Sequence, residues 1–126
     1  MRKLILLALC LLLTACSAKA IAPRSGVYRM SAPPETLIVP ALSLDVEAGT
    51  FTFTYDGFSS YLPAGSYEQD DTVLRCRTSD GRYTYLFRLV NETTLAFIAD
   101  GSADVSLIDE RSGQPVVEGS VFLLDD

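Results

Sequence analysis

Leu42-Ser43-Leu44-Asp45-Val46, then Glu47-Ala48-Gly49-Thr50, then Phe51-Thr52-Phe53-Thr54-Tyr55, is the stretch that decides the fold. Apolar and polar side chains alternate on both sides of a turn, as in half-buried β-strands. A two-residue loop at Ala48-Gly49 fixes the register of the expected pairs, which are Val46 with Phe51, Leu44 with Phe53 and Leu42 with Tyr55. The stretch therefore predicts an antiparallel hairpin with all six apolar side chains on one face.

The same test, which asks whether a given loop length pairs apolar residues with apolar residues, predicts three more hairpins along the chain. Two-residue loops are expected at Asp70-Asp71 and at Asp80-Gly81, and the second is the dipeptide favoured in type I′ turns. A two-residue loop at Asn91-Glu92 would oppose apolar to polar residues, so a bulged three-residue turn is expected from Asn91 to Thr93. The resulting pairs are Tyr67 with Leu74, Thr78 with Tyr83, Cys76 with Tyr85, Leu74 with Phe87, Leu89 with Leu95, and Phe87 with Phe97.

Consecutive hairpins with one shared apolar face form a meander, which exposes its edges unless it curls and closes. We therefore predict an all-β fold, a small up-and-down (meander) β-barrel with lipocalin-like architecture. Gly26 to Met30 would be the first strand and Ser120 to Leu124 the last, and these two would pair to close the barrel. The connection from Ala99 to Gly119 is long, and Val105 to Ile108 is a candidate extra strand within it.

The inward face of this barrel would be rich in aromatic side chains, namely Phe51, Phe53, Tyr55, Tyr67, Tyr83, Tyr85, Phe87 and Phe97. They could line an apolar pocket in the barrel mouth. A barrel of this size has little room left after such side chains, which favours a filled core. The tyrosine hydroxyls need partners if they are buried, or else they lie at one rim where a ligand can reach them.

The N-terminus carries an export signal. Arg2-Lys3 precedes an apolar run from Leu4 to Leu13, which is too short to span a bilayer as a helix. Leu13-Thr14-Ala15-Cys16 resembles the lipobox of bacterial lipoproteins. The resemblance implies cleavage before Cys16 and attachment of a diacylglyceryl, palmitate-type group to its thiol. An ordinary signal peptide cut after Ala20 is the alternative, because Ala18-Lys19-Ala20 also fits a cleavage site.

These observations divide the chain into a signal peptide (1–15), a lipidated Cys16 with its tether (16–25), and a single barrel domain (26–126). Loss of Arg2 and Lys3 would leave eight of the ten basic residues beside sixteen acidic ones, so the formal net charge would fall from −6 to −8. An acidic domain is a poor partner for nucleic acid. The expected location is extracytoplasmic, at the cell surface or in the periplasm, where the lipid would anchor the protein to the membrane.

The composition argues against catalysis. There is no His, which removes the commonest general base and metal ligand, so we predict no enzyme, no metal and no cofactor. Asp100, Ser102 and Asp104 mimic the start of a calcium loop, but Val105 and Arg111 stand where Gly and Glu are required. Cys76 would be the one thiol left after processing, and it faces inward as inert packing.

The longest connection inside the meander runs from Asp56 to Gly65 and supplies our candidate binding residues. They are Phe58, Ser59, Ser60, Tyr61 and Leu62. Loops on a rigid scaffold commonly carry recognition, and aromatic side chains are common anchors. Alternatively, Phe58 and Leu62 fold back and plug the barrel. A second candidate surface is the outward-facing set of Arg75, Arg77 and Arg88, although a solvated outer face with Glu68 as neighbour is the simpler interpretation.

Three segments carry a family resemblance, namely Thr50-Phe51-Thr52-Phe53-Thr54-Tyr55, the run from Ser59 to Tyr67, and Asp80-Gly81-Arg82-Tyr83-Thr84-Tyr85-Leu86-Phe87. Together they resemble a small extracytoplasmic β domain of Gram-positive bacterial lipoproteins. That domain is also appended to antirepressor-type membrane metallopeptidases, whose zinc motif is absent from this sequence. The resemblance implies no established activity, and the likeness to lipocalin-type and lysozyme-inhibitor lipoproteins is one of architecture.

The function expected from these features is non-enzymatic binding, as an accessory or sensory module for an envelope protein or a ligand. The first alternative is a lipocalin-like carrier of a small apolar ligand among the inward aromatic side chains. The second is an inhibitor of a cell-wall-degrading enzyme, which would act through the loop from Phe58 to Leu62.

Overall fold

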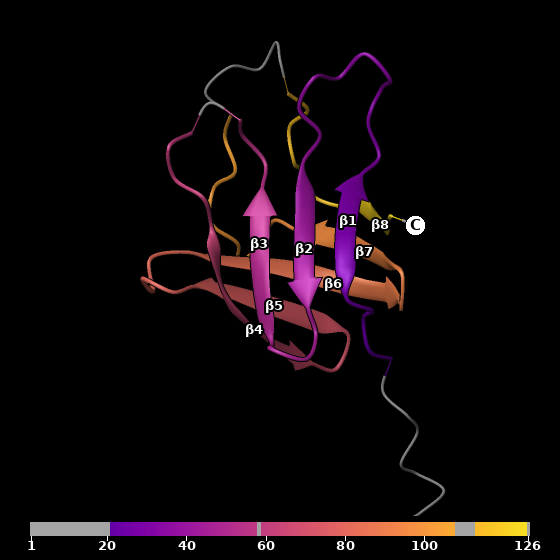
Figure 1. The fold of residues 1–126 in the computed structure, drawn as a ribbon, viewed down its shortest axis with the longest axis vertical. Helices are drawn as coiled ribbons and strands as arrows, with labels where there is room; N and C mark the ends of the chain where they lie inside the picture. Colours follow the sequence, from indigo (N-terminus) through magenta and orange to yellow (C-terminus); the bar gives the residue numbers. More distant parts are fainter. Residues whose placement is uncertain (1–20, 58, 108–112, 126) are drawn as a thin grey trace, which may run out of the picture.

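Eight strands follow one another around a closed antiparallel barrel in the computed structural model, which describes residues 21–57, 59–107 and 113–125. Each strand pairs with the next along the chain, and the last pairs with the first (Figure 1). The predicted meander barrel is therefore confirmed. The strands are β1 (Gly26–Met30), β2 (Ala41–Asp45), β3 (Thr50–Thr54), β4 (Ala64–Asp70), β5 (Val73–Thr78), β6 (Thr84–Asn91), β7 (Thr94–Ile98) and β8 (Val121–Leu124).

Two of the four predicted hairpins have the expected register. In β5–β6, Cys76 pairs with Tyr85 and Leu74 with Phe87. In β6–β7, Leu89 pairs with Leu95 and Phe87 with Phe97, as predicted. The predicted three-residue turn from Asn91 to Thr93 is wrong, because Asn91 pairs with Thr94 and leaves a two-residue turn at 92–93, while the bulge lies inside β6 between Leu89 and Asn91. The turn at Asp80-Gly81 is not type I′, however. Gly81 has a φ of 73° but Asp80 does not take a positive φ, which type I′ requires at both positions.

The other two hairpins are shifted by two residues. Leu42 pairs with Phe53 and Leu44 with Phe51, so the loop is residues 46–49 and not Ala48-Gly49 alone. Asp45 stabilises the longer loop, because its Oδ1 accepts from the amide of Ala48 at 3.1 Å and its carbonyl accepts from Gly49 at 2.8 Å. Val46 therefore leaves the inward stripe and is 38% exposed.

In β4–β5 the loop is residues 71–72, so Tyr67 pairs with Cys76 and not with Leu74. Asp71 takes a φ of 56°, which Asp tolerates better than most residues and which places the reversal one position later than predicted. A shift of two residues leaves each side chain that stays within the strands on its predicted face, because the side-chain period of a strand is two. The inward stripe is thus retained although the pairing differs.

The long connection after β7 departs from expectation in one respect. Residues 105–107 form no strand, and Ile108 lies outside the described residues. The bridge in this region is instead a parallel one between Ile38 and Gly113. β8 begins at Val121, one residue after the predicted start.

Aromatic rings fill the barrel. Phe53 lies at their centre and makes edge-to-face contacts with Tyr85, Phe87 and Phe122 at centroid separations of 5.1, 5.4 and 6.1 Å. The surrounding core residues include Tyr28, Leu42, Leu74, Leu89 and Leu95, each with no more than 2% of its surface exposed. The filled-core interpretation is therefore confirmed for the middle of the barrel, and Tyr55, Tyr67 and Tyr83 pack partly buried against it.

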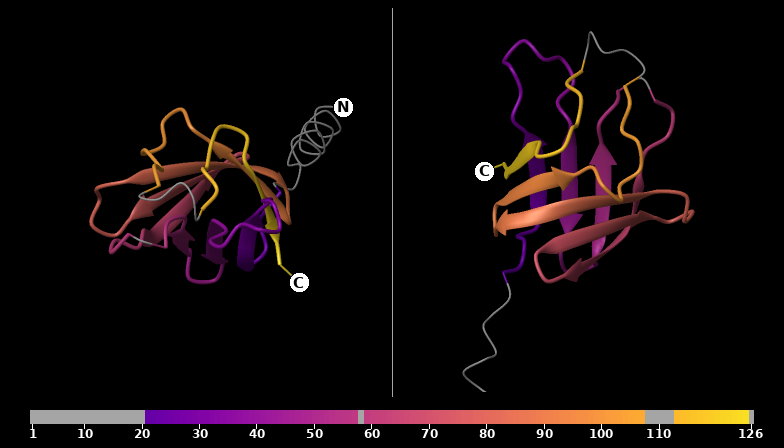
Figure 2. Two further views of the ribbon diagram at one scale, coloured as in Figure 1. Left: turned by 90° about the horizontal axis from the view of Figure 1, so that it is seen from above. Right: turned by 180° about the vertical axis from the view of Figure 1, so that it is seen from behind.

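The two ends of the barrel differ in construction. One end, here called the turn end, carries the short connections 46–49, 71–72 and 92–93. The other, the loop end, carries the long connections 31–40, 55–63 and 99–120, which lie toward the top of Figure 1 and of the right-hand view in Figure 2. These loops meet, because Ile38 bridges Gly113 and a Cβ placed on Gly57 would lie 2.5 Å from Cδ1 of Ile38. The loop end is thus one continuous surface.

Candidate binding site at the loop end

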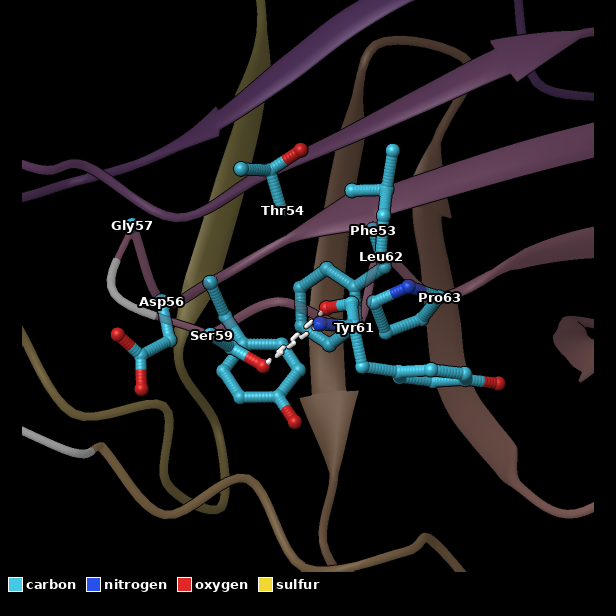
Figure 3. A pocket seen from close by; sticks show the side chains of 9 residues that line it. Phe53, Thr54, Asp56, Gly57, Ser59, Tyr61, Leu62 and Pro63 are labelled. Carbon is cyan, nitrogen blue, oxygen red and sulfur yellow. Dashed lines mark hydrogen bonds between the residues drawn. The ribbon is translucent and has the colours of Figure 1, made fainter.

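A cavity of about 210 Å³ opens at the loop end where β3 runs into the following connection (Figure 3). The amide of Phe53 donates to the carbonyl of Pro63 at 2.8 Å, and this bond draws the far end of the connection back against the end of β3. The lining residues are Phe53, Thr54, Tyr55, Asp56, Gly57, Ser59, Tyr61, Leu62 and Pro63. Phe53 links the cavity to the core, because the same ring contacts the buried aromatic cluster.

Three of the five predicted binding residues line this cavity. Ser59 and Tyr61 are held in a local turn, in which the Ser59 hydroxyl accepts from the Tyr61 amide at 3.2 Å and donates to the Tyr61 carbonyl at 3.3 Å. Leu62 also lines the cavity, Ser60 is exposed beside it, and Phe58 lies outside the described residues.

The plug interpretation is wrong for Leu62, which is 57% exposed. The side chains that cover the barrel at this end come from the other loops. Val105 and Val116, from the connection before β8, are 8% and 5% exposed, and Val39 and Ala103 pack beside the core. Sequence reasoning missed these residues because they follow no regular period, and the burial of the valines leaves Leu62 free to face solvent.

Tyrosines gather around the cavity. The ring of Tyr61 lies 5.5 Å from that of Tyr83 at an interplanar angle of 67°, and Tyr55 lies 6.3 Å from Tyr85. Tyr83 is also covered by a cation, since Cζ of Arg82 is 5.3 Å from its ring centroid. Tyr55 and Tyr83 thus lie at the loop end, partly buried against the core, whereas Tyr67 lies toward the turn end, where its amide donates to Gly49, so the tyrosines do not gather at one rim.

Asp80 organises this aromatic rim. Its carboxylate accepts from the hydroxyl of Thr78 at 2.7 Å, from the amide of Arg82 at 2.9 Å and from the hydroxyl of Tyr61 at 2.8 Å. The Thr78 bond, followed by that of the Arg82 amide, lowers the pKa of Asp80 below its ordinary value. Asp80 is therefore ionised at neutral pH and acts as a fixed acceptor. Burial conversely raises the pKa of the Tyr85 hydroxyl, which keeps it protonated.

A second cavity, of about 420 Å³, opens at the same end between the two halves of the long connection before β8. Its apolar walls come from Phe97, Ala103, Val105 and Val116, and Asp104 and Glu118 lie at its border. One of the positions that resembled a calcium loop has a structural role. The Ser102 hydroxyl donates to the Ile98 carbonyl at 2.5 Å and accepts from the Leu86 amide. Among residues 21–57, 59–107 and 113–125, no three His, Cys, Asp or Glu side chains are grouped to hold a metal ion.

The remaining predicted features have structural roles or lie elsewhere. Cys76 has no exposed surface, and burial raises the pKa of its thiol, so it is unreactive packing in the folded protein. Arg75 and Arg77 face outward beside Glu68 and Ser66 around a cavity of about 200 Å³. Glu68 stands opposite Arg75 in the register, as the solvated-face interpretation predicted. Cys16 lies outside the described residues.

No protein-family model, curated protein or solved structure matches this chain. The structure itself establishes a small all-β barrel of eight antiparallel strands, and it does so without assigning a family. Within the part of the chain that the structure describes, no helix has the length and apolar character needed to cross a membrane.

Proposed function

We propose that this protein is a lipid-anchored, extracytoplasmic binding module, without enzymatic activity, that recognises a protein partner through its loop end. The observation that carries the proposal is a cavity at the end of the barrel that Tyr55 and Tyr61 line, with the ring of Tyr83 packed against that of Tyr61. Tyrosine supplies a large amphipathic contact at low cost in conformational entropy, and Tyr and Arg dominate binding hot spots. Arg82, whose guanidinium lies over the ring of Tyr83, adds an arginine to this group of tyrosines.

The size of the cavity supports a protruding group of a larger partner as its occupant. At about 210 Å³ it lies below the range of roughly 300–1,000 Å³ that encloses a drug-sized molecule. Leu62 is exposed at its edge, and Leu37 and Val117, on the two neighbouring loops, are 83% and 57% exposed. Exposed apolar side chains on neighbouring loops, beside a cavity lined by aromatic residues, are typical of a protein-binding surface.

Charge favours a partner that is not acidic. The chain has a formal net charge of −6, and Asp80 holds its negative charge at the rim. An acidic surface attracts basic or neutral partners and repels acidic ones.

The membrane anchor rests on the lipobox-like Leu13-Thr14-Ala15-Cys16 and on the resemblance to small extracytoplasmic β domains of Gram-positive lipoproteins. Its test is whether Cys16→Ser, expressed in the producing cell, loses both the lipid mass and retention at the membrane. A variant that is processed and retained like the parent protein would contradict the anchor.

The binding surface can be tested by a photo-crosslinking amino acid placed at Leu62, with Glu47 at the turn end as the matched exposed control. We expect covalent adducts from Leu62 in intact cells, and we expect Tyr61→Ala to weaken them while the domain keeps its melting temperature. Adducts of equal yield from positions 62 and 47 would argue against recognition by the loop end.

The carrier alternative retains one supporting observation, which is the second cavity of about 420 Å³ with its apolar walls. Its volume falls within the range for small ligands. Native mass spectrometry of the protein purified without detergent would decide between the two functions. A carrier should show an extra mass that denaturation removes and that Ala103→Phe abolishes, whereas a protein-binding module should show the bare chain.

A further inference from the structure

Residues 21–25 are bound across the turn end of the barrel and are not a free tether. The backbone amide of Arg24 donates to the carbonyl of Glu92 at 3.1 Å, and their side chains form an ion pair at 2.6 Å. On the other side of the turn end, Nε2 of Gln69 donates to the carbonyl of Ile21 at 2.5 Å. The segment is thus fastened at both of its ends.

The same segment contacts two of the three turns at this end directly and is linked to the third through the side chain of Gln69. Ser25 accepts from the amide of Val46 at 2.8 Å, Gln69 also donates to the carbonyl of Asp71, and Arg24 reaches the turn that contains Glu92. Pro23 is buried in the middle of the segment. The proline ring restricts the backbone between the hydrogen bonds on either side of it. The position of Ile21 on the barrel is therefore fixed.

The covalent reach from this point to Cys16 is short. Cys16 and Ile21 are five positions apart, so their Cα atoms can be separated by at most about 18 Å, at about 3.6 Å per residue. A five-residue strand such as β1 already covers roughly 17 Å, and the loops at the far end extend beyond it. A lipid on Cys16 would therefore hold the turn end near the membrane while the loop end stays out of reach of the same surface.

We infer that the turn end faces the membrane and that the loop end, with its tyrosine-lined cavity, is presented outward to a protein in the aqueous space beyond the lipid. The inference rests on the proposed lipid anchor and adds the side from which the partner must approach. It excludes the opposite arrangement, in which exposed Leu37, Leu62 and Val117 insert into the bilayer.

Charge at the turn end opposes its insertion into an anionic membrane, so the tether alone would hold this end near the surface. Carboxylates gather there, at Asp45, Glu47, Asp70, Asp71 and Glu92, and the nearby Arg24 is already paired with Glu92. An anionic membrane surface repels such a group of carboxylates within a Debye length of about 8 Å. Exposed apolar side chains occur at both ends, with Leu37, Leu62 and Val117 at the loop end and Ile21, Val46 and Val90 at the turn end, so the orientation follows from the tether and not from apolar exposure.

The test uses the full-length lipidated protein in phospholipid vesicles that carry a nitroxide quencher on the headgroups. A fluorophore is attached through Glu47→Cys at the turn end or through Leu37→Cys at the loop end. Cys76 has no exposed surface and the Cys16 thiol is occupied by lipid, so each variant offers a single reactive site. We expect severalfold stronger quenching at position 47 than at position 37.

A third sample separates orientation from anchoring. Ten Gly and Ser residues inserted between Ala20 and Ile21 should reduce the quenching difference between positions 47 and 37, because a longer tether lets the barrel turn over. Equal or reversed quenching in the parent protein, while it still sediments with the vesicles, would overturn the orientation alone. Protein that carries no lipid and does not sediment with the vesicles would overturn the anchor and the orientation with it.

Discussion

The hydroxyl of Tyr61 donates a 2.8 Å hydrogen bond to Oδ2 of Asp80, across nineteen positions of the chain. The bond joins the connection after β3 to the turn after β5 and fixes one wall of the cavity at the loop end. Because the same carboxylate accepts from Thr78 and Arg82, its position is set by the turn and not by Tyr61. The turn is therefore the fixed support against which Tyr61, and with it the connection 55–63, is aligned.

The alignment of Tyr61 should weaken in acid. The pKa of Asp80 is lowered in the folded state below its ordinary value of 3.8, first by the Thr78 bond. A lowered folded-state pKa contributes stability that is present above the ordinary value and is lost as the pH falls through the folded value. We expect the near-ultraviolet circular dichroism of the tyrosines to change below about pH 4, and the change to be absent in Asp80→Asn. Glu35→Gln is the control, and an unaltered acid transition in Asp80→Asn would contradict the role of this carboxylate.

Phe53 should be among the most costly core positions to truncate. It has no exposed surface and contacts three buried rings, so Phe53→Ala is expected to lower the free energy of unfolding by about 3–5 kcal/mol. Leu37→Ala, at an 83% exposed position, should change it by less than about 0.5 kcal/mol. Urea unfolding followed by tyrosine fluorescence measures both values. A small loss for Phe53→Ala would mean that the barrel centre is loosely packed.

Gly65 is required by a close approach of two strands. A Cβ at this position would lie 2.1 Å from the carbonyl oxygen of Arg77 and 2.8 Å from the amide nitrogen of Ser79, and neither backbone atom can turn aside. We expect Gly65→Ala to destabilise the barrel by about 3 kcal/mol or more. Gly49→Ala is the matched control, because it meets nothing within 4 Å and carries only the cost of a φ of 69°, about 1–2 kcal/mol. Equal melting temperatures for the two variants would contradict this packing.

Release of the N-terminal segment can be measured by proteolysis. The buried hydroxyl of Tyr28 donates to the carbonyl of Arg24 at 2.6 Å and lies 3.1 Å from that of Glu92. Tyr28→Phe removes about 1 kcal/mol of local stability and should speed tryptic cleavage after Arg24 several-fold. Tyr83→Phe, at the loop end, should leave this cleavage rate unchanged. The same cleavage rate in Tyr28→Phe would show that the other contacts hold the segment without this hydroxyl.

The sequence by itself determined which residues form strands and which face each side chain takes. Both are local properties, because alternation of apolar and polar residues needs no knowledge of the partner strand. The bounds of β1, the pairing of Leu89 with Leu95 and the pairing of β1 with β8 were all predicted correctly. The alternation could not place the turns at 46–49 and 71–72. A register shift of two residues keeps each side chain of a strand on the same face of the sheet, so both registers fit the pattern.

Only the tertiary structure decided what lies together at the two ends of the barrel. The Tyr61–Asp80 bond, the Ile38–Gly113 bridge and the fastening of residues 21–25 beneath Glu92 all join segments with no shared period. Irregular loops fold against whatever the closed barrel brings beside them, so their contacts depend on the positions of all eight strands. The alternation of apolar and polar residues that specifies each strand ends where the loops begin. There Val105 and Val116 are buried over the core, whereas Leu62 is exposed to solvent.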